Sequence, residues 1–140
     1  MTREGFRLLE HTADFGIEAW GPDLASLFRQ GALALFDAAI DPSTVRERLT
    51  ERVEAEADDV ELLFKEWLSA LLYYFAAKGV VFRRFEIEEI SERRVRATCH
   101  GERYSEKRHR LKTDLKAVTY HQLSVRREGE SWRARVIVDV

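Results

Sequence analysis

Apolar residues recur at the three- and four-residue spacing of a helix in two segments of the chain. The first segment follows Asp23, a good N-cap residue, and its periodic apolar positions are Leu24, Leu27, Phe28, Gly31 and Leu35. We expect this helix to end before Asp41, because the proline after it disfavours the helical conformation of the preceding residue. We interpret the apolar positions as core.

The second helical segment has the most regular pattern in the chain. Asp58 and Asp59 offer a cap and negative charge at its start, and Lys78-Gly79 provides a cation and a left-handed residue at its end. The apolar positions between them are Val60, Leu63, Phe64, Trp67, Leu68, Leu71, Leu72 and Phe75. Because this segment is apolar on nearly every side, we expect the central buried helix, interrupted at Glu66 by an exposed position.

The other regular segments alternate between apolar and polar residues, which is typical of strands with one buried face. They are residues 6–9, 15–21, 50–57, 81–87, 95–99, 117–125 and 132–138. In the run that begins at Phe15, the side chains of Ile17 and Ala19 lie on the same face as that of Phe15. Glu18 and Trp20 lie on the other face. In the last run Trp132, Ala134, Val136 and Val138 form one face, opposite Arg133, Arg135, Ile137 and Asp139.

Residues 128–131 separate two alternating runs and predict a hairpin connection. Two helices among several mostly antiparallel strands predict an α+β fold, a two-layer sandwich with the helices packed on the sheet. The 140 residues suffice for one domain spanning 1–140, since a chain of this length buries about two-thirds of its unfolded surface. We find no repeat, linker or low-complexity tract.

Composition narrows the class of protein. The 23 Lys and Arg residues nearly balance the 25 Asp and Glu residues, so the chain is not an obvious nucleic-acid binder, although local basic patches remain open. The single Cys99 excludes an internal disulfide framework and fits a reducing compartment. Because no long uncharged apolar run and no leader pattern is present, we expect a cytoplasmic protein without a membrane span.

The familiar catalytic and metal-binding motifs are missing from the sequence. The four histidines are His11, His100, His109 and His121, and their spacing does not support a structural zinc site. We find no phosphate-binding glycine loop, no nucleophile elbow and no Cys-His catalytic pattern. Cys99 lies in an alternating run, which is typical of a small buried residue.

Asp14 stands where the chain enters the strand that begins at Phe15, after His11 and Thr12. Aspartate is depleted in strands because its carboxylate competes for nearby backbone donors. Taken alone, Asp14 therefore fits a turn residue at a strand start. It also fits an oxygen ligand or an anionic group at a sheet edge.

The C-terminus helps to decide between these two interpretations of Asp14, because the last strand pattern runs directly into Asp139-Val140. Chain ends usually fray, whereas here we expect the Asp139 side chain and the terminal carboxylate of Val140 to be held in place. Two adjacent negative groups repel each other unless a positive charge lies between them. A hard cation such as Ca²⁺ or Mg²⁺ takes only oxygen ligands, so three oxygen donors converge if Asp14 faces the same point.

A second polar grouping lies in residues 109–121, where Lys112 and Lys116 stand near Asp114, Tyr120 and His121. In an extended chain Lys116 and Tyr120 share one face. This grouping fits a polar rim on a sheet as well as it fits a functional surface.

Four blocks of the sequence, in this order, resemble the archease family. They are HTADFGI at 11–17, Glu66-Trp-Leu with Leu71-Leu72, LKAVTYH at 115–121 and WRARVIVDV at 132–140. The resemblance covers nearly the whole chain. Phe15 and Val138 stand where the family more often has other apolar residues, and we see no departure at the polar positions.

The resemblance implies a small protein that activates an RtcB-type RNA ligase in tRNA splicing and RNA repair, with the chemistry left to the ligase. It implies that the chain promotes guanylylation and multiple turnover of the ligase and broadens its nucleotide use, meeting RNA only through the ligase. It also implies a divalent-cation site of Asp14, Asp139 and Val140, with calcium expected and magnesium or manganese as alternatives. We further assign Lys116, His11 and His121 to ligase activation. The implied fold is a strand-helix-strand-strand domain with a helical insertion.

Two other classes of function stay open at this point. The chain could serve as an adaptor or chaperone for another RNA-modifying enzyme, such as a tRNA methyltransferase. It could also be a divalent-metal-dependent hydrolase that uses the same carboxylates to activate water. Such hydrolases usually carry more acidic ligands and a clear base, and the sequence offers neither.

Overall fold

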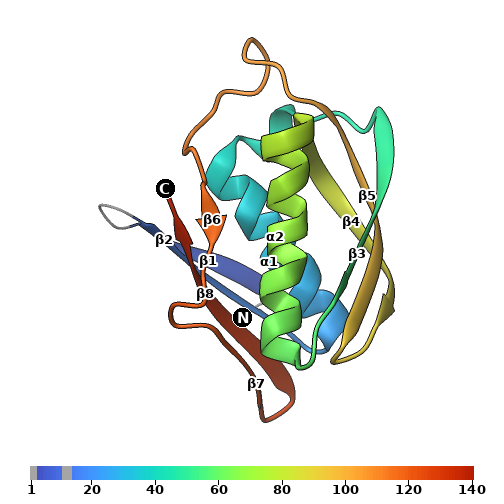
Figure 1. Cartoon of the computed structure of the whole chain (residues 1–140), viewed down its shortest axis with the longest axis vertical. Helices are drawn as coiled ribbons and strands as arrows, with labels where there is room; N and C mark the ends of the chain where they lie inside the picture. Colours follow the sequence, from blue (N-terminus) through green and yellow to red (C-terminus); the bar gives the residue numbers. More distant parts are fainter. Residues whose placement is uncertain (1–2, 11–13) are drawn as a thin grey trace.

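The computed structural model describes residues 3–10 and 14–140 (Figure 1). This part of the chain forms eight strands, two α-helices and one short 3-10 helix. In chain order the elements are β1 (Gly5–Glu10), β2 (Asp14–Gly21), α1 (Leu24–Ala39), η1 (Pro42–Thr44), β3 (Leu49–Glu56), α2 (Val60–Lys78), β4 (Val80–Ile90), β5 (Arg94–Arg103), β6 (Ala117–Val118), β7 (Ser124–Glu128) and β8 (Ser131–Asp139).

Helix α1 begins and ends where the sequence predicts. Asp23 is its N-cap and accepts a hydrogen bond from the Ser26 backbone N–H at 2.8 Å, and Ser26 Oγ accepts from the Asp23 N–H in return. This reciprocal pair satisfies two donors that the first helical turn leaves free. The C-cap is Ile40, immediately before Asp41-Pro42. Residues of α1 pack against β2 and also against β4.

Helix α2 is capped as predicted, by Asp59 at its start and by Gly79 at its end. Gly79 has a φ of 65°, a left-handed conformation that an L residue adopts only at a cost. Trp67 is fully buried at the centre of the helix and its Nε1–H donates to the Phe28 carbonyl oxygen of α1 at 2.9 Å. In residues 3–10 and 14–140, no helix combines the length and the apolar character needed to cross a bilayer.

The expected burial of α2 on nearly every side is wrong for one side of its C-terminal half. Tyr73 is 57% exposed there, and Ala76 and Ala77 are also exposed. The apolar pattern of the sequence does not reveal this, because tyrosine and alanine occupy surfaces and cores alike. The Glu66 side chain is 44% exposed, as expected for the position that interrupts the pattern.

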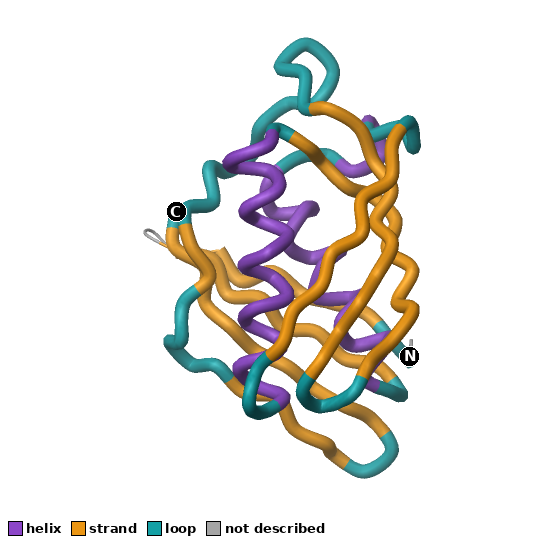
Figure 2. The backbone as a smooth tube through the Cα atoms, turned by 45° about the vertical axis from the view of Figure 1, so that its right-hand side comes forward, coloured by secondary structure: helices purple, strands orange, loops and turns teal. Residues whose placement is uncertain are grey.

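The predicted α+β fold with antiparallel strands is confirmed. The strands are divided between two sheets. One sheet has five strands in the order β1-β2-β8-β6, with β7 also paired to β8, and the other has three in the order β3-β5-β4. Both helices lie against both sheets, so the core fills the space between them (Figures 1 and 2).

The strand expected over residues 117–125 is wrong, because the chain leaves the sheet after Val118 and rejoins it at Ser124. Thr119 begins the interruption: its Oγ1 donates to the Ile137 carbonyl oxygen at 2.9 Å and accepts from the His121 N–H. Gln122 has a positive φ of 55°. A hydroxyl that satisfies local backbone groups competes with strand pairing, which explains the break.

The five-stranded sheet has one covered and one open face, as the alternation predicts. Phe15, Ile17 and Val136 are buried against the helices. The residues that alternate with the buried ones along β2 and β8 point away from the helices. Of these residues, Arg133 and Asp139 are exposed. We call this second side the outer face. Within the described residues, both helices pack on the opposite side of the sheet.

Candidate functional site

Asp14 and Asp139 are directly opposite each other at one end of the five-stranded sheet. Asp14 is the first residue of β2, and Asp139 is the last residue of β8. Opposed residues of an antiparallel pair point to the same face, with Cβ atoms about 5 Å apart. The sheet therefore brings two carboxylates from the two ends of the chain together on the outer face. With the terminal carboxylate of Val140, we call this group the acidic corner.

One carboxylate oxygen of the acidic corner has no hydrogen-bond partner within the part of the chain that the structure describes. Asp14 Oδ1 is buried and accepts no hydrogen bond from any described group. An unsatisfied buried acceptor costs free energy, and a carboxylate beside a like charge costs more. A bound divalent cation would remove both penalties, because hard cations take carboxylate oxygens as ligands. The residues of the corner thus fit the group that the sequence implies.

The last residues of the chain are held by backbone and side-chain contacts. The Lys116 N–H donates to the Asp139 carbonyl oxygen at 2.8 Å, and Ala117 pairs with Asp139 in the β6–β8 ladder. The Val140 side chain packs against the hydrophobic core. Both views place the C-terminus beside the beginning of β2 (Figures 1 and 2). The end of β8 is thereby held where Asp139 pairs with Asp14.

The donors available at the corner are few. In residues 3–10 and 14–140, no three His, Cys, Asp or Glu side chains are grouped so as to hold a metal ion. The predicted ligand set therefore consists of two side-chain carboxylates and one main-chain carboxylate. A site with so few protein ligands leaves coordination positions open to water or to a partner's groups.

Lys116 adjoins the acidic corner through its backbone, and its exposed side chain lines a shallow groove between α2 and β6. Helix α2 contributes Lys65 and Tyr73 to the same groove. Lys65 Nζ lies 4.4 Å from the centre of the Tyr120 ring, a cation–π contact at the groove's edge. The groove therefore brings Lys65, Lys116 and Tyr73 together on the helix side of β6, with the exposed Tyr120 ring in contact with Lys65.

Of the two histidines assigned to ligase activation, His121 lies in the part of the chain that the structure describes. His121 is exposed in the turn after β6, where its backbone N–H donates to Thr119 Oγ1 at 3.1 Å. No hydrogen bond or ion pair joins its side chain to the other site residues that the structure describes. His11 lies outside the described residues.

A buried ionic network that the sequence analysis missed anchors the segment leading to Lys116. His109 is fully buried, and its Nδ1 accepts from the Ser105 N–H at 2.9 Å. Its Nε2–H is then free to donate to Glu102 Oε2, 2.8 Å away. Glu102 also accepts from the Arg46 backbone N–H and pairs with Arg108.

The electrostatics of Glu102 follow from these partners. Burial by itself would raise the pKa of this carboxyl group. The hydrogen bonds from the Arg46 N–H, His109 and Arg108 outweigh burial and lower the pKa to about 2. A glutamate near a strand end and a histidine seven residues later form no recognisable motif, so this pair could not be predicted from the sequence.

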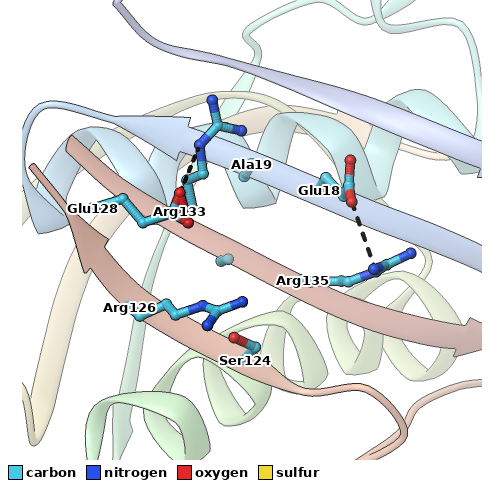
Figure 3. Close-up of a pocket in the computed structure, with 8 residues that line it drawn as sticks. Glu18, Ala19, Ser124, Arg126, Glu128, Arg133 and Arg135 are labelled. Atoms are coloured by element: carbon cyan, nitrogen blue, oxygen red, sulfur yellow. Dashed lines mark ion pairs between the residues drawn. The ribbon is translucent and has the colours of Figure 1, made fainter.

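A shallow cleft rich in arginine lies farther along the outer face (Figure 3). Strand β7 contributes Ser124 and Arg126, and β8 contributes Arg133 and Arg135. Arg133 Nε lies 3.6 Å from Glu128 Oε1. Arg135 Nε lies 3.7 Å from Glu18 Oε2. We call this set of residues the arginine cleft. The hairpin predicted at residues 128–131 is confirmed, because β7 and β8 pair across it, whereas alternation alone does not predict the register that sets Arg126 opposite Arg133.

Comparison with known proteins agrees with this architecture. Residues 6–140 match the model of the Archease protein family (MTH1598/TM1083). The protein archease of Methanosarcina acetivorans is 38% identical over 139 residues, which cover 96% of this chain and 95% of that protein. The protein archease of Sulfolobus acidocaldarius is 30% identical over the full length of both chains.

Solved structures give the same result. The solution structure of Methanobacterium thermoautotrophicum protein 1598 has a TM-score of 0.81 and 32% identity, and the match covers 97% of this chain and 99% of that one. The crystal structure of an archease and possible chaperone from Thermotoga maritima shares the fold, with a TM-score of 0.66 and 20% identity. From the family model and the curated relatives together, we conclude that the chain belongs to the archease family.

Proposed function

We propose that this chain is a non-catalytic activator of an RtcB-type RNA ligase that works through a divalent cation at the acidic corner. The observation that carries the proposal is the pairing of Asp14 with Asp139, together with the buried Asp14 Oδ1, which has no hydrogen-bond partner among the described residues. Strand pairing normally avoids like charges directly opposite each other, because they destabilise the sheet. A function that requires both carboxylates explains why this sheet tolerates them.

Asp14, Asp139 and the Val140 carboxylate would hold the cation, with calcium expected and magnesium or manganese as alternatives. When bound, such an ion stabilises negative charge on phosphoryl oxygens, the charge that develops in guanylylation. This chain contributes the fixed position of the carboxylates that would hold the cation. The paired strands β2 and β8 fix both aspartates, and the Lys116–Asp139 hydrogen bond fixes the residue before the terminus. The corner is thus presented as a rigid unit to the ligase.

In this proposal the Lys116 side chain assists by attracting a phosphate group of the nucleotide or the RNA end. The backbone contact of Lys116 with Asp139 and its exposed side chain support this role. His11 and His121 are further candidates for ligase activation. The partner is expected to present its own metal-containing site to the corner.

The test is a multiple-turnover ligation assay with purified RtcB-type ligase, nucleotide and RNA. We expect Asp14→Asn and Asp139→Asn each to abolish stimulation while both variants remain folded. Asp114→Asn is the matched control, because Asp114 is an exposed aspartate near Lys116 that lies outside the acidic corner. Full stimulation by both corner variants would refute the proposal. RNA or nucleotide turnover without any ligase would instead favour a metal-dependent enzyme.

A further inference from the structure

Two arginines of the arginine cleft stand directly opposite each other, Arg126 on β7 and Arg133 on β8. Like charges in this position repel and weaken the pairing of the strands. Glu128 lies close enough to Arg133 to offset part of the repulsion. Arg126 is exposed and forms no ion pair with any residue of the described chain. Among the residues that the structure describes, the cleft therefore has one cation without a counter-ion.

The third arginine, Arg135, shares the Glu18 carboxylate with Arg7, so its charge is offset only in part, and a hydroxyl lies beside it. Arg135 is paired across the strands with Ser124, which comes two residues before Arg126 on the same face of β7. Figure 3 shows Arg126 and Ser124 lying next to each other over β7, with Arg135 across from them. Guanidinium groups and a hydroxyl around a shallow hollow make donors for the oxygens of a phosphate group.

The arginine cleft and the acidic corner share one open surface. Along β8 the side chains on the outer face are Arg133, Arg135, Ile137 and Asp139, in that order. At about 3.4 Å per residue, the distance from Arg133 to Asp139 is roughly 20 Å. An extended ligand held at the cleft can thus reach the corner without crossing any described helix.

An aromatic ring lies beside the cleft on the same face. The ring of Trp20 covers Gly5 of β1 so closely that a Cβ there would lie 2.9 Å from its Cζ2 atom. Arg133 Cζ is 5.5 Å from the centre of the Trp20 ring. Open sheets that combine arginine with aromatic side chains bind single-stranded nucleic acid, because phosphates meet the cations and bases stack on the rings.

We propose that the arginine cleft binds the phosphate backbone of single-stranded RNA and directs the RNA end along β8 to the acidic corner. The direction rests on the proposed function, since it assumes that the corner meets the ligase's reactive site. The binding itself does not, and it adds a direct contact of this chain with RNA. The near-zero net charge of the chain agrees with a local basic surface of this kind rather than a general affinity for nucleic acid.

The test measures fluorescence anisotropy of a labelled short oligouridylate with the purified chain, without ligase and in EDTA. Wild-type binding is expected to weaken as salt rises. We expect Arg126→Ala to lower the affinity about tenfold and to reduce the salt slope by about one. Arg93→Ala is the matched control, because Arg93 is exposed in the turn between β4 and β5 on the other sheet. This control is expected to bind as wild type does.

Circular dichroism melts of all the variants establish that each is folded. Equal affinities of wild type and Arg126→Ala, or no binding by wild type, would overturn the proposal. So would an Arg126→Ala variant that binds RNA normally but fails to co-sediment with the ligase, since the cleft would then be a protein contact. Asp139→Asn, which tests the acidic corner, is expected to keep its RNA binding. A negative result for one proposal therefore leaves the other standing.

Discussion

Asp14 on β2 and Asp139 on β8 are partners in an antiparallel ladder, although nearly the whole chain separates them. The same ladder pairs Phe15 with Val138, and both of these residues are buried. Core packing of this apolar pair therefore sets the register that brings the two carboxylates together. A slip of β8 by one residue would turn Asp139 toward the helices and move it away from Asp14, so the hydrophobic pattern and the acidic corner depend on each other.

In the absence of divalent cations, removing the negative charge of Asp14 or Asp139 should stabilise the protein. We expect Asp139→Asn to raise the free energy of unfolding in EDTA by about 0.5 kcal/mol, because a like-charge pair across the strands is relieved. Asp139 is exposed and its backbone carbonyl keeps its hydrogen bond from the Lys116 N–H, so the substitution removes little else. Urea denaturation followed by circular dichroism measures the difference. A loss of stability of similar size would show that the carboxylate already has a favourable partner.

Lys116→Ala separates the role of the side chain from that of the backbone. The hydrogen bond from Lys116 to Asp139 uses the backbone N–H, which alanine retains. We expect stability within about 0.5 kcal/mol of wild type, unchanged calcium binding and a clear loss of ligase stimulation. Lys107→Ala, at an exposed lysine in the preceding segment, is the control and should stimulate fully. Unfolding of Lys116→Ala would assign the residue a structural role.

Glu102 should make stability depend on pH in the acid range. Its pKa is about 2 in the folded chain and about 4.5 when unperturbed, so the folded state binds the proton less readily. The resulting stabilisation is fully present above pH 4.5 and is lost as pH falls toward 2; it amounts to roughly 3 kcal/mol.

Glu102→Gln should therefore lower the free energy of unfolding at neutral pH by about 2 to 3 kcal/mol and flatten its decline between pH 4.5 and 2. Urea unfolding measured across this pH range is the experiment. Glu106→Gln changes an exposed glutamate of the same segment and should behave as wild type. An unaltered pH profile in Glu102→Gln would remove Glu102 as the source of the acid sensitivity.

Local patterns predicted both helices with their caps, because capping depends on residues adjacent in the sequence, such as Asp23 with Ser26. Alternation likewise predicted which side of β2 and of β8 faces the core. The division of the strands into two sheets depends on contacts between distant segments, which periodicity does not contain. The break between β6 and β7 arises from the hydroxyl of Thr119. The sequence alternates through this region without interruption, so the pattern gives no sign of the break.

The candidate site was accessible from the sequence only in part. Asp139 and Val140 were suggested by a strand pattern that reaches the chain end, and the resemblance to the archease family linked them to Asp14. The pairing of Arg126 with Arg133 follows from the register of a hairpin, and two exposed arginines give no warning of it. The contact between His109 and Glu102 depends on how a non-helical segment folds back, which no local rule describes.

The most direct test of the acidic corner is isothermal titration calorimetry of calcium into the purified, metal-free chain. Wild type should bind one calcium ion per molecule, and both Asp14→Asn and Asp139→Asn should show no heat of binding, while Asp114→Asn titrates like wild type. Undiminished calcium binding by either corner variant would contradict the account, because the cation would then be held elsewhere.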